Sequence, residues 1–298
     1  MPPFELRGTF TALVTPFTGD DADIDWPAYE RHLEGQIAGH VVGLVPCGTT
    51  GESPTLGDRE RFDLVRRAVQ VAAGRAFVMA GTGSNDTRKA VEQAKSAAEA
   101  GADAVMLAMP PYSRPSQAAL SDYVETVAAA VSQCPVVVYN VPSRTAVAID
   151  VDTLIEAAAR SPNVVGLKDA SGSVLYCQSL ISRIHGRLSV LSGDDALTLP
   201  MMAVGAQGVI SVTSNVLPAA VDRVVQAALA GRYDVARAEH LHLLNVHDAM
   251  FCAPSPGPAK AALAARGAIQ PVLRRPLDWP TPGQAARVVA AVQMFESQ

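Results

Sequence analysis

One lysine of this sequence ends an apolar stretch that otherwise reads as a buried strand. It is Lys168 in NVVGLKDASG (163–172), and the 24 basic residues include only four lysines, namely Lys89, Lys95, Lys168 and Lys260. Burial disfavours an ammonium ion, so the pKa of such a lysine falls from about 10.4 and a free amine can attack a carbonyl carbon. Arginine cannot lose its proton in this way. Lys168 is therefore our candidate for a Schiff base, and the alternative is a lysine that reaches solvent or pairs with Asp169.

A tyrosine and two threonines at other predicted strand ends could serve that chemistry. Tyr139 ends the preceding strand, and neighbouring strands lie about 4.8 Å apart, so its hydroxyl could relay protons to a substrate on Lys168. Thr49 or Thr50 in GTTGE (48–52) could orient the phenol. The glycines of GTTGE also permit a tight turn whose backbone N–H groups bind an anion. A core aromatic residue and an ordinary turn are the alternatives.

Other polar residues near strand ends indicate binding or capping. Arg144 follows Pro142, and its planar guanidinium suits a substrate carboxylate, although a surface ion pair is the alternative. Asp194 and Asp195 have no histidine or third carboxylate at a spacing that suits a metal, so we expect them to cap the next helix.

Three histidines, His240, His242 and His247, resemble a metal cluster at first sight. On a helix, however, positions 240 and 242 face apart, and we expect this helix to lie away from the strand ends. We therefore predict neither a metal site nor a cofactor.

The candidate site residues lie at the ends of eight predicted strands, which alternate with helical segments. Strands without polar alternation, buried on both faces, are typical of parallel sheets. The apolar runs are GTFTALVTP, VVGLVPCG, AFVMAGTG, AVMLAMPP, PVVVYNVP, NVVGLKDA, LSVLSGDD and QGVISVTSN. Eight such units predict an α/β fold, a (β/α)8 TIM barrel over residues 1–225. The main rival, a doubly wound sheet, lacks its glycine fingerprint after the first strand.

Helix signals support this division of the chain. Residues 25–39 begin with Asp25 as a candidate N-cap and end in glycine, and residues 85–101 begin with Asn85 or Asp86 and end in glycine. From about Leu217 onward only helices follow, interrupted by the proline-rich segments APSPGPAK (253–260) and LRRPLDWPTPG (273–283). Residues 226–298 are accordingly predicted to be a C-terminal helical extension.

Composition excludes several classes of protein. The chain of 298 residues is 49% hydrophobic and has a net charge of −5, with no basic stripe, so nucleic-acid binding has no support. Four dispersed cysteines predict neither a zinc site nor a disulfide framework. No apolar run approaches the roughly 20 residues that span a bilayer, and no secretory signal stands at the N-terminus. We expect a cytoplasmic protein that binds no membrane.

Taken together, four blocks resemble the dihydrodipicolinate synthase and N-acetylneuraminate lyase family of pyruvate-dependent class I aldolases. They are GTTGES (48–53), YNVPSRT (139–145), GLKDASG (166–172), and LSGDD with GVISVTSN (191–195 and 208–215). Each block alone is weak, but their combination and order are highly specific. The resemblance implies that Lys168 forms the Schiff base with pyruvate, that Tyr139 relays protons, and that Thr49 bonds to this tyrosine.

The same resemblance implies the remaining site residues and the assembly. Thr50 would hold the pyruvate carboxylate, Gly193 and Ile210 would add substrate contacts, and Tyr112 would complete the relay across a tight dimer interface. A homo-oligomer, usually a dimer of dimers, is therefore expected. Arg144 is typical of the synthases, where it binds the carboxylate of L-aspartate 4-semialdehyde.

This points to condensation of pyruvate with that semialdehyde to 4-hydroxy-tetrahydrodipicolinate, in lysine and diaminopimelate biosynthesis. A 2-keto-3-deoxy sugar-acid aldolase or an N-acetylneuraminate-type lyase is the alternative within the family. A catalytically silent barrel that serves as a scaffold is the alternative outside it.

Some positions depart from the synthase pattern. Pro111 stands where an aromatic residue often precedes the relay tyrosine, and Ala253 and Ser255 stand where many members carry glutamate and asparagine. Asp58, Arg61 and Lys89 fall in the stretches from which the family builds its lysine-feedback pocket. These departures argue against classical inhibition by lysine.

Overall fold

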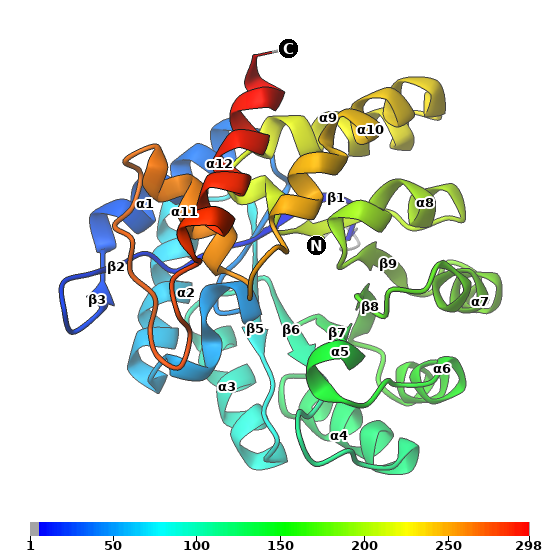
Figure 1. The fold of residues 1–298 in the computed structure, drawn as a ribbon. Coiled ribbons are helices and arrows are strands. Elements are labelled where there is room, and N and C mark those ends of the chain that lie inside the picture. Colours follow the sequence, from blue (N-terminus) through cyan, green and yellow to red (C-terminus); the bar gives the residue numbers. More distant parts are fainter. Residues whose placement is uncertain (1–5, 298) are drawn as a thin grey trace.

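The structure, a computed structural model that describes residues 6–297, is built around a closed barrel of eight parallel strands (Figure 1). Neighbouring strands in the series pair with each other, and β10 closes the ring by pairing with β1. The barrel strands are β1 (Gly8–Ala12), β4 (Gly43–Val45), β5 (Phe77–Thr82), β6 (Ala104–Ala108), β7 (Val136–Asn140), β8 (Val164–Asp169), β9 (Ser189–Ser192) and β10 (Gly208–Ser211). They coincide with the eight predicted apolar runs, so the predicted barrel is confirmed.

Two apolar cores explain why these strands lack polar alternation. One core fills the inside of the barrel and includes Phe10, Met79, Met106 and Leu191. The other lies between the strands and the surrounding helices. The strands from β4 to β10 contribute to one core on each face, so apolar residues occupy successive positions along them. Strand β1 differs, because its outward-facing Thr9 and Thr11 donate hydrogen bonds to Asp222 and Gln36.

The helices that follow the barrel strands form the outer ring in Figure 1. They are α1 (Trp26–Ala38), α2 (Asp58–Ala72), α3 (Thr87–Glu99), α4 (Gln117–Ala130), α6 (Val151–Arg160), α7 (Val174–Ile184), α8 (Thr198–Ala203) and α9 (Pro218–Leu229). The predicted caps are confirmed: Asp25 accepts a hydrogen bond of 3.0 Å from the N–H of Ala28, and Asp86 accepts one of 2.9 Å from that of Arg88. Unsatisfied N–H groups in the first turn explain the carboxylates there.

Several short elements interrupt the βα connections and were not predicted. They are the hairpin β2 (Phe17–Thr18) with β3 (Asp23–Ile24), the one-turn helix α5 (Pro142–Thr145), and the 3₁₀ turns η1 (Thr49–Gly51), η2 (Ser53–Thr55), η3 (Asp195–Leu197) and η4 (Thr213–Asn215). All of them follow the carboxyl ends of barrel strands.

The C-terminal extension contains α10 (Tyr233–Ala249), α11 (Gly257–Ala265) and α12 (Pro282–Glu296). Helix α10 packs on α9, and α12 packs on both α10 and α11, as the yellow to red part of Figure 1 shows. The predicted boundary between residues 225 and 226 falls inside α9, which runs unbroken to Leu229 and packs against β1 and β10 as the eighth barrel helix.

The segment APSPGPAK separates two helices as expected, because α10 ends before it at Ala249. The sequence did not predict α11, which begins within the segment at Gly257. Pro258 stands in the first turn, where a missing N–H costs no intrahelical hydrogen bond, so the proline starts the helix instead of breaking it. Within residues 6–297, no helix has both the length and the apolar character that crossing a membrane requires.

Candidate active site

Lys168 and Tyr139 lie side by side at the carboxyl ends of β8 and β7. The parallel register pairs these two residues directly. The Nζ atom of Lys168 lies 4.4 Å from the centre of the Tyr139 ring, and each residue is only 5% exposed. The prediction that Lys168 and Tyr139 end neighbouring strands is confirmed, and their roles in the reaction stay predictions.

The environment of Lys168 favours its neutral amine. Burial lowers the pKa of Lys168 to about 7, the negative charge of Asp195 opposes this shift, and the positive charge of Arg144 adds to it. Asp169 does not neutralise the lysine, because it faces the helix layer, where its charge raises the pKa values of Tyr176 and Cys177 on α7. The predicted outward orientation of Asp169 is thus confirmed, and the lowered pKa of Lys168 favours the neutral amine that our Schiff-base prediction requires.

The phenol of Tyr139 has the partner that the resemblance implied. Burial raises its pKa, whereas the charge of Arg144 and a hydrogen bond with the Thr49 side chain lower it. Of the two threonines that the sequence left open, Thr49 therefore contacts the tyrosine. A hydroxyl held between a hydrogen-bond partner and a cation can take up and release a proton.

The GTTGE turn forms the wall opposite β8. Residues 49–51 make one 3₁₀ turn, closed by a 3.0 Å hydrogen bond from the N–H of Gly51 to the carbonyl of Gly48. The hydroxyl of Thr15 at the end of β1 donates to the carbonyl of Gly51 over 2.8 Å. Thr50 is buried, and Glu52 completes the turn in the left-handed conformation with φ of 58°.

A cavity of about 310 Å³ brings six of the predicted site residues together, namely Thr49, Thr50, Tyr139, Arg144, Lys168 and Gly193. Gly193 must lack a side chain: a Cβ there would lie 3.1 Å from Cε of Lys168 and 2.8 Å from Cβ of Ala170. This glycine leaves room beside the lysine. The cavity is large enough for a small keto acid and a second small substrate.

Two predicted residues are not among the described residues that line this cavity. Ile210 is fully buried in the inner core, and Val212 forms the wall beyond β10 instead. Tyr112 is 89% exposed and has a φ of 75°, which is unusual for a residue with a side chain. Their roles in substrate binding and proton relay stay predictions.

The two aspartates after β9 differ from each other. Asp194 caps η3 by accepting a 3.0 Å hydrogen bond from the N–H of Ala196, as predicted. Asp195 does not cap that turn. It is buried and accepts the hydroxyl of Ser211 and the N–H groups of Val212 and Thr213, over 2.9 and 3.1 Å for the latter two. The capping prediction for Asp195 was wrong because the chain after β10 passes over it and supplies closer donors.

His240 and His242 on α10 face apart as predicted, but the prediction that this helix lies away from the strand ends was wrong. His242 packs on Phe295, whereas the ring of His240 lies 5.8 Å from that of His247. His247 Nδ1 lies 2.9 Å from the hydroxyl of Thr213, immediately after β10, so this helix is not remote from the strand ends. Residues 6–297 hold no group of three or more histidine, cysteine, aspartate or glutamate residues arranged to bind a metal ion.

The extension contributes two cavity residues that sequence reasoning missed. Phe251 and Ser255, which connect α10 to α11, lie over the mouth of the barrel. The Ser255 hydroxyl is buried and has no hydrogen-bond partner within the described structure, so it is free to bind a ligand. Ser255 stood out in the sequence only as a departure from the family pattern, which did not reveal its place.

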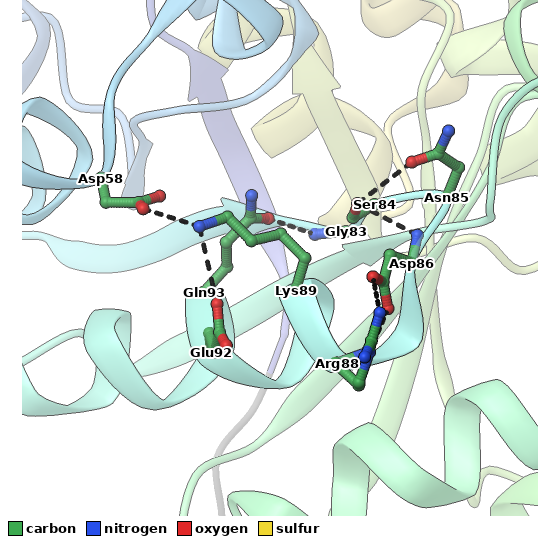
Figure 2. A network of polar contacts seen from close by, with 9 residues as sticks. All are labelled: Asp58, Gly83, Ser84, Asn85, Asp86, Arg88, Lys89, Glu92 and Gln93. Atoms are coloured by element: carbon green, nitrogen blue, oxygen red, sulfur yellow. Dashed lines mark hydrogen bonds and ion pairs between the residues drawn. The ribbon is translucent and has the colours of Figure 1, made fainter.

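A second cavity of about 560 Å³ shares Thr49, Tyr139 and Arg144 and extends outward to α2 and α3. Figure 2 shows its outer wall, where Lys89 Nζ lies 2.6 Å from a carboxylate oxygen of Asp58 and 3.5 Å from one of Glu92. Arg61 donates to the carbonyl of Ser53 over 2.5 Å. Asp58, Arg61 and Lys89 line this cavity, whereas Glu92 lies behind Lys89 and does not. Our expectation that lysine does not inhibit through this region stays a prediction.

Comparisons with known proteins agree with this geometry. Residues 5–294 match the model of the dihydrodipicolinate synthetase family. A 4-hydroxy-tetrahydrodipicolinate synthase from Sorangium cellulosum is 52% identical over 295 residues, covering 98% of this chain and 97% of the relative.

Two solved structures are similar over nearly the whole chain. The 4-hydroxy-tetrahydrodipicolinate synthase of Methylacidiphilum fumariolicum SolV superposes with a TM-score of 0.96 at 40% identity, covering 98% of this chain and 97% of the other. The dihydrodipicolinate synthase of Aquifex aeolicus gives 0.95 at 37% identity, with 98% of each chain covered.

Proposed function

The chain belongs to the dihydrodipicolinate synthetase family, and from this premise we propose how its barrel mouth joins pyruvate to L-aspartate 4-semialdehyde. The product is 4-hydroxy-tetrahydrodipicolinate, and the reaction belongs to lysine and diaminopimelate biosynthesis. The observation that carries the mechanism is the buried amine of Lys168, which lies against Tyr139 in a cavity beside Arg144.

The first half of the reaction activates pyruvate. The neutral amine of Lys168 attacks the keto carbon, and Tyr139 moves protons so that the resulting carbinolamine loses water to form an imine. Loss of a proton from the pyruvate methyl group then gives an enamine. Thr49 keeps the Tyr139 hydroxyl in place for these proton transfers.

The second half joins the two substrates. The enamine carbon attacks the aldehyde carbon of the semialdehyde, whose oxygen takes up a proton and becomes the hydroxyl of the product. The amine of the former semialdehyde then attacks the imine carbon and displaces Lys168, which closes the ring and regenerates the free lysine. One water molecule leaves overall, in the first half.

The two carboxylates of the substrates need separate anchors. Thr50 and the backbone N–H groups of the GTTGE turn hold the pyruvate carboxylate, because they face Lys168 across the cavity. Arg144, on α5, binds the carboxylate of the semialdehyde. A short, charged aldehyde needs such a cation, whereas a polyhydroxylated sugar acid needs neutral donors and acceptors.

We further propose that the chain works as a homo-oligomer in the cytoplasm. Tyr112 supports the oligomer, because a tyrosine that is 89% exposed and held at a φ of 75° is suited to reach into a partner subunit. Gel filtration coupled to light scattering tests this, and a monomer at micromolar concentration would contradict it.

Borohydride trapping tests the Schiff base. The protein is incubated with pyruvate, reduced, and measured as intact mass and as peptides. We expect one reduced pyruvyl group on Lys168. The variant Lys168→Arg should take up none, whereas Lys95→Arg, a change at an exposed lysine on α3, should react like the wild type. A wild-type protein without an adduct, or an adduct on Lys168→Arg, would disprove the mechanism.

Steady-state kinetics with Arg144→Ala test the second substrate. The Michaelis constant for the semialdehyde should rise about tenfold to a hundredfold, because a charged hydrogen bond is lost, while pyruvate trapping continues. Turnover of 2-keto-3-deoxy sugar acids in place of the semialdehyde by the wild-type enzyme would instead favour the alternative aldolase.

A further inference from the structure

Lys260 is a second buried lysine that the reaction does not use. It lies on α11 and is completely buried, and its Nζ atom is 2.5 Å from a carboxylate oxygen of Glu52, which is equally inaccessible. The same Nζ donates to the carbonyl of Val272 over 3.0 Å and lies 4.3 Å from the ring centre of Phe17. Although Lys260 and Glu52 are 208 positions apart, they form a buried, hydrogen-bonded ion pair.

Glu52 connects this pair to the candidate active site. It is the last residue of the GTTGE turn, and its N–H donates to the carbonyl of Thr49 over 3.1 Å. Its second carboxylate oxygen accepts the N–H of Arg274 over 2.9 Å, so residues of the extension hold both oxygens.

The backbone of Glu52 needs this support. Its φ of 58° and ψ of 37° place it in the left-handed region, which residues with a side chain occupy at a cost. Such a conformation persists where surrounding contacts enforce it. The buried carboxylate supplies those contacts, and the turn that it closes carries Thr49 and Thr50.

A second cation strengthens the link between the extension and the turn. The guanidinium of Arg274 lies 4.3 Å from the ring centre of Phe17, on which Lys260 also packs, and it forms an ion pair of 2.6 Å with Glu60 on α2. In Figure 1 the chain that follows α11 runs beside α1 and α2, in agreement with these contacts. The extension thus contacts both Glu52 and the helix α2 that follows the turn.

We propose that Lys260 is a positioning residue, which through Glu52 holds the GTTGE turn in the shape that binds the pyruvate carboxylate and orients Tyr139. The proposal rests on the proposed function, since it assigns the pyruvate site to that turn. It gives the C-terminal extension a part in substrate binding besides its packing on the barrel.

Kinetics of the variant Lys260→Met test this role. The Michaelis constant for pyruvate should rise about tenfold, because small displacements of binding groups cost one to two orders of magnitude. The Michaelis constant for the semialdehyde should change less than twofold, because Arg144 is held by β7 and α5. A protein that is merely less stable would lose active enzyme without changing either constant.

Two further variants separate positioning from stability. Val288→Ala changes a buried site on α12 that does not touch the turn. This variant should lower the midpoint temperature of thermal unfolding and leave the Michaelis constant for pyruvate unchanged. The double variant Lys260→Met with Glu52→Met removes both charges and should regain much of the thermal midpoint, since apolar replacements of a buried ion pair are often tolerated. The Michaelis constant of this double variant for pyruvate should stay above that of the wild type.

The outcomes distinguish this proposal from the proposed function. If wild-type protein forms no pyruvate adduct, the function itself fails. If the wild type forms the adduct but Lys260→Met keeps the wild-type pyruvate constant, or the double variant regains it together with its stability, the pair only stabilises the fold and the positioning role is disproved.

Discussion

We assign different roles to two buried lysines that have similar surroundings. Lys168 lies over the ring of Tyr139 at 4.4 Å, and Lys260 lies over the ring of Phe17 at 4.3 Å. Burial lowers the pKa of the first to about 7 and that of the second to about 8. Yet Lys260 has a carboxylate partner at 2.5 Å, whereas Asp195 acts on Lys168 only through its charge.

Burial alone is therefore not our reason for choosing Lys168 as the nucleophile. The Lys168 amine opens into a cavity of about 310 Å³ and has no carboxylate hydrogen-bonded to it, so it can lose its proton and meet a substrate. The Lys260 amine is enclosed and donates to Glu52 and Val272. Access and the absence of a bonded anion, more than the size of the pKa shift, separate a nucleophile from a structural cation.

Replacing each lysine by methionine should show the largest difference between them, in kcat and in the pyruvate adduct. Lys168→Met should lower kcat at least about a thousandfold and abolish the pyruvate adduct, because the nucleophile is lost. Lys260→Met should keep the adduct on Lys168. Intact mass after borohydride reduction measures both, and an adduct that disappears only in Lys260→Met would reverse the two assignments.

The same two variants should differ in stability. Lys260→Met leaves Glu52 as a buried, unpaired charge, so the free energy of unfolding at pH 7 should fall by about 3–5 kcal/mol. Lys168→Met removes a desolvated amine without breaking a pair, so its free energy of unfolding should equal or exceed that of the wild type. Urea denaturation followed by circular dichroism measures both values. A larger loss in Lys168→Met would contradict this prediction.

The aromatic rings beneath the two amines should also differ in function. Tyr139→Phe keeps the ring but removes the hydroxyl that relays protons, so kcat should fall about a hundredfold. Phe17→Leu removes the ring under both Lys260 and Arg274 and should leave kcat within about twofold, because Phe17 does not line the cavity and these contacts contribute packing and cation–π attraction. Steady-state kinetics with both substrates provide the measurement. Equal losses in the two variants would mean that the tyrosine acts only through its ring.

The pH dependence of imine formation should show the lowered pKa of Lys168. Burial favours the neutral amine, so proton loss occurs at about pH 7. The initial rate of trapping at saturating pyruvate should therefore rise about tenfold between pH 6 and pH 8 and then level off. A rate that still increases tenfold per pH unit above pH 8 would indicate an ordinary lysine with a pKa near 10.4.

Most of the barrel could be predicted from local patterns. The eight strands follow from apolar runs, because a strand buried on both faces needs apolar residues at successive positions. Asp25 and Asp86 predict where helices begin, because the first N–H groups of a helix need acceptors. The Lys168 and Tyr139 pair was predictable because parallel strands end at the same edge of a barrel, and the register brings the two residues together.

Contacts between distant parts of the chain could not be predicted in the same way. Asp195 was expected to cap a helix, but donors from the chain after β10 reach its carboxylate. Phe251 and Ser255 line the candidate active site only because α10 returns over the mouth of the barrel. A local pattern reports which residues are buried, but it does not report which distant residue lies opposite.

The eight strands, the strand-end lysine with its neighbouring tyrosine, and the reaction class that the four motif blocks indicate could thus be inferred from local sequence. The pairing of Lys260 with Glu52, and the contacts of the C-terminal extension with the GTTGE turn, became visible only in the folded chain. The physical reason is the range of the interactions. Strand burial and helix capping depend on residues close in the chain, whereas the Lys260–Glu52 pair exists only after the barrel has closed and the extension has packed on it.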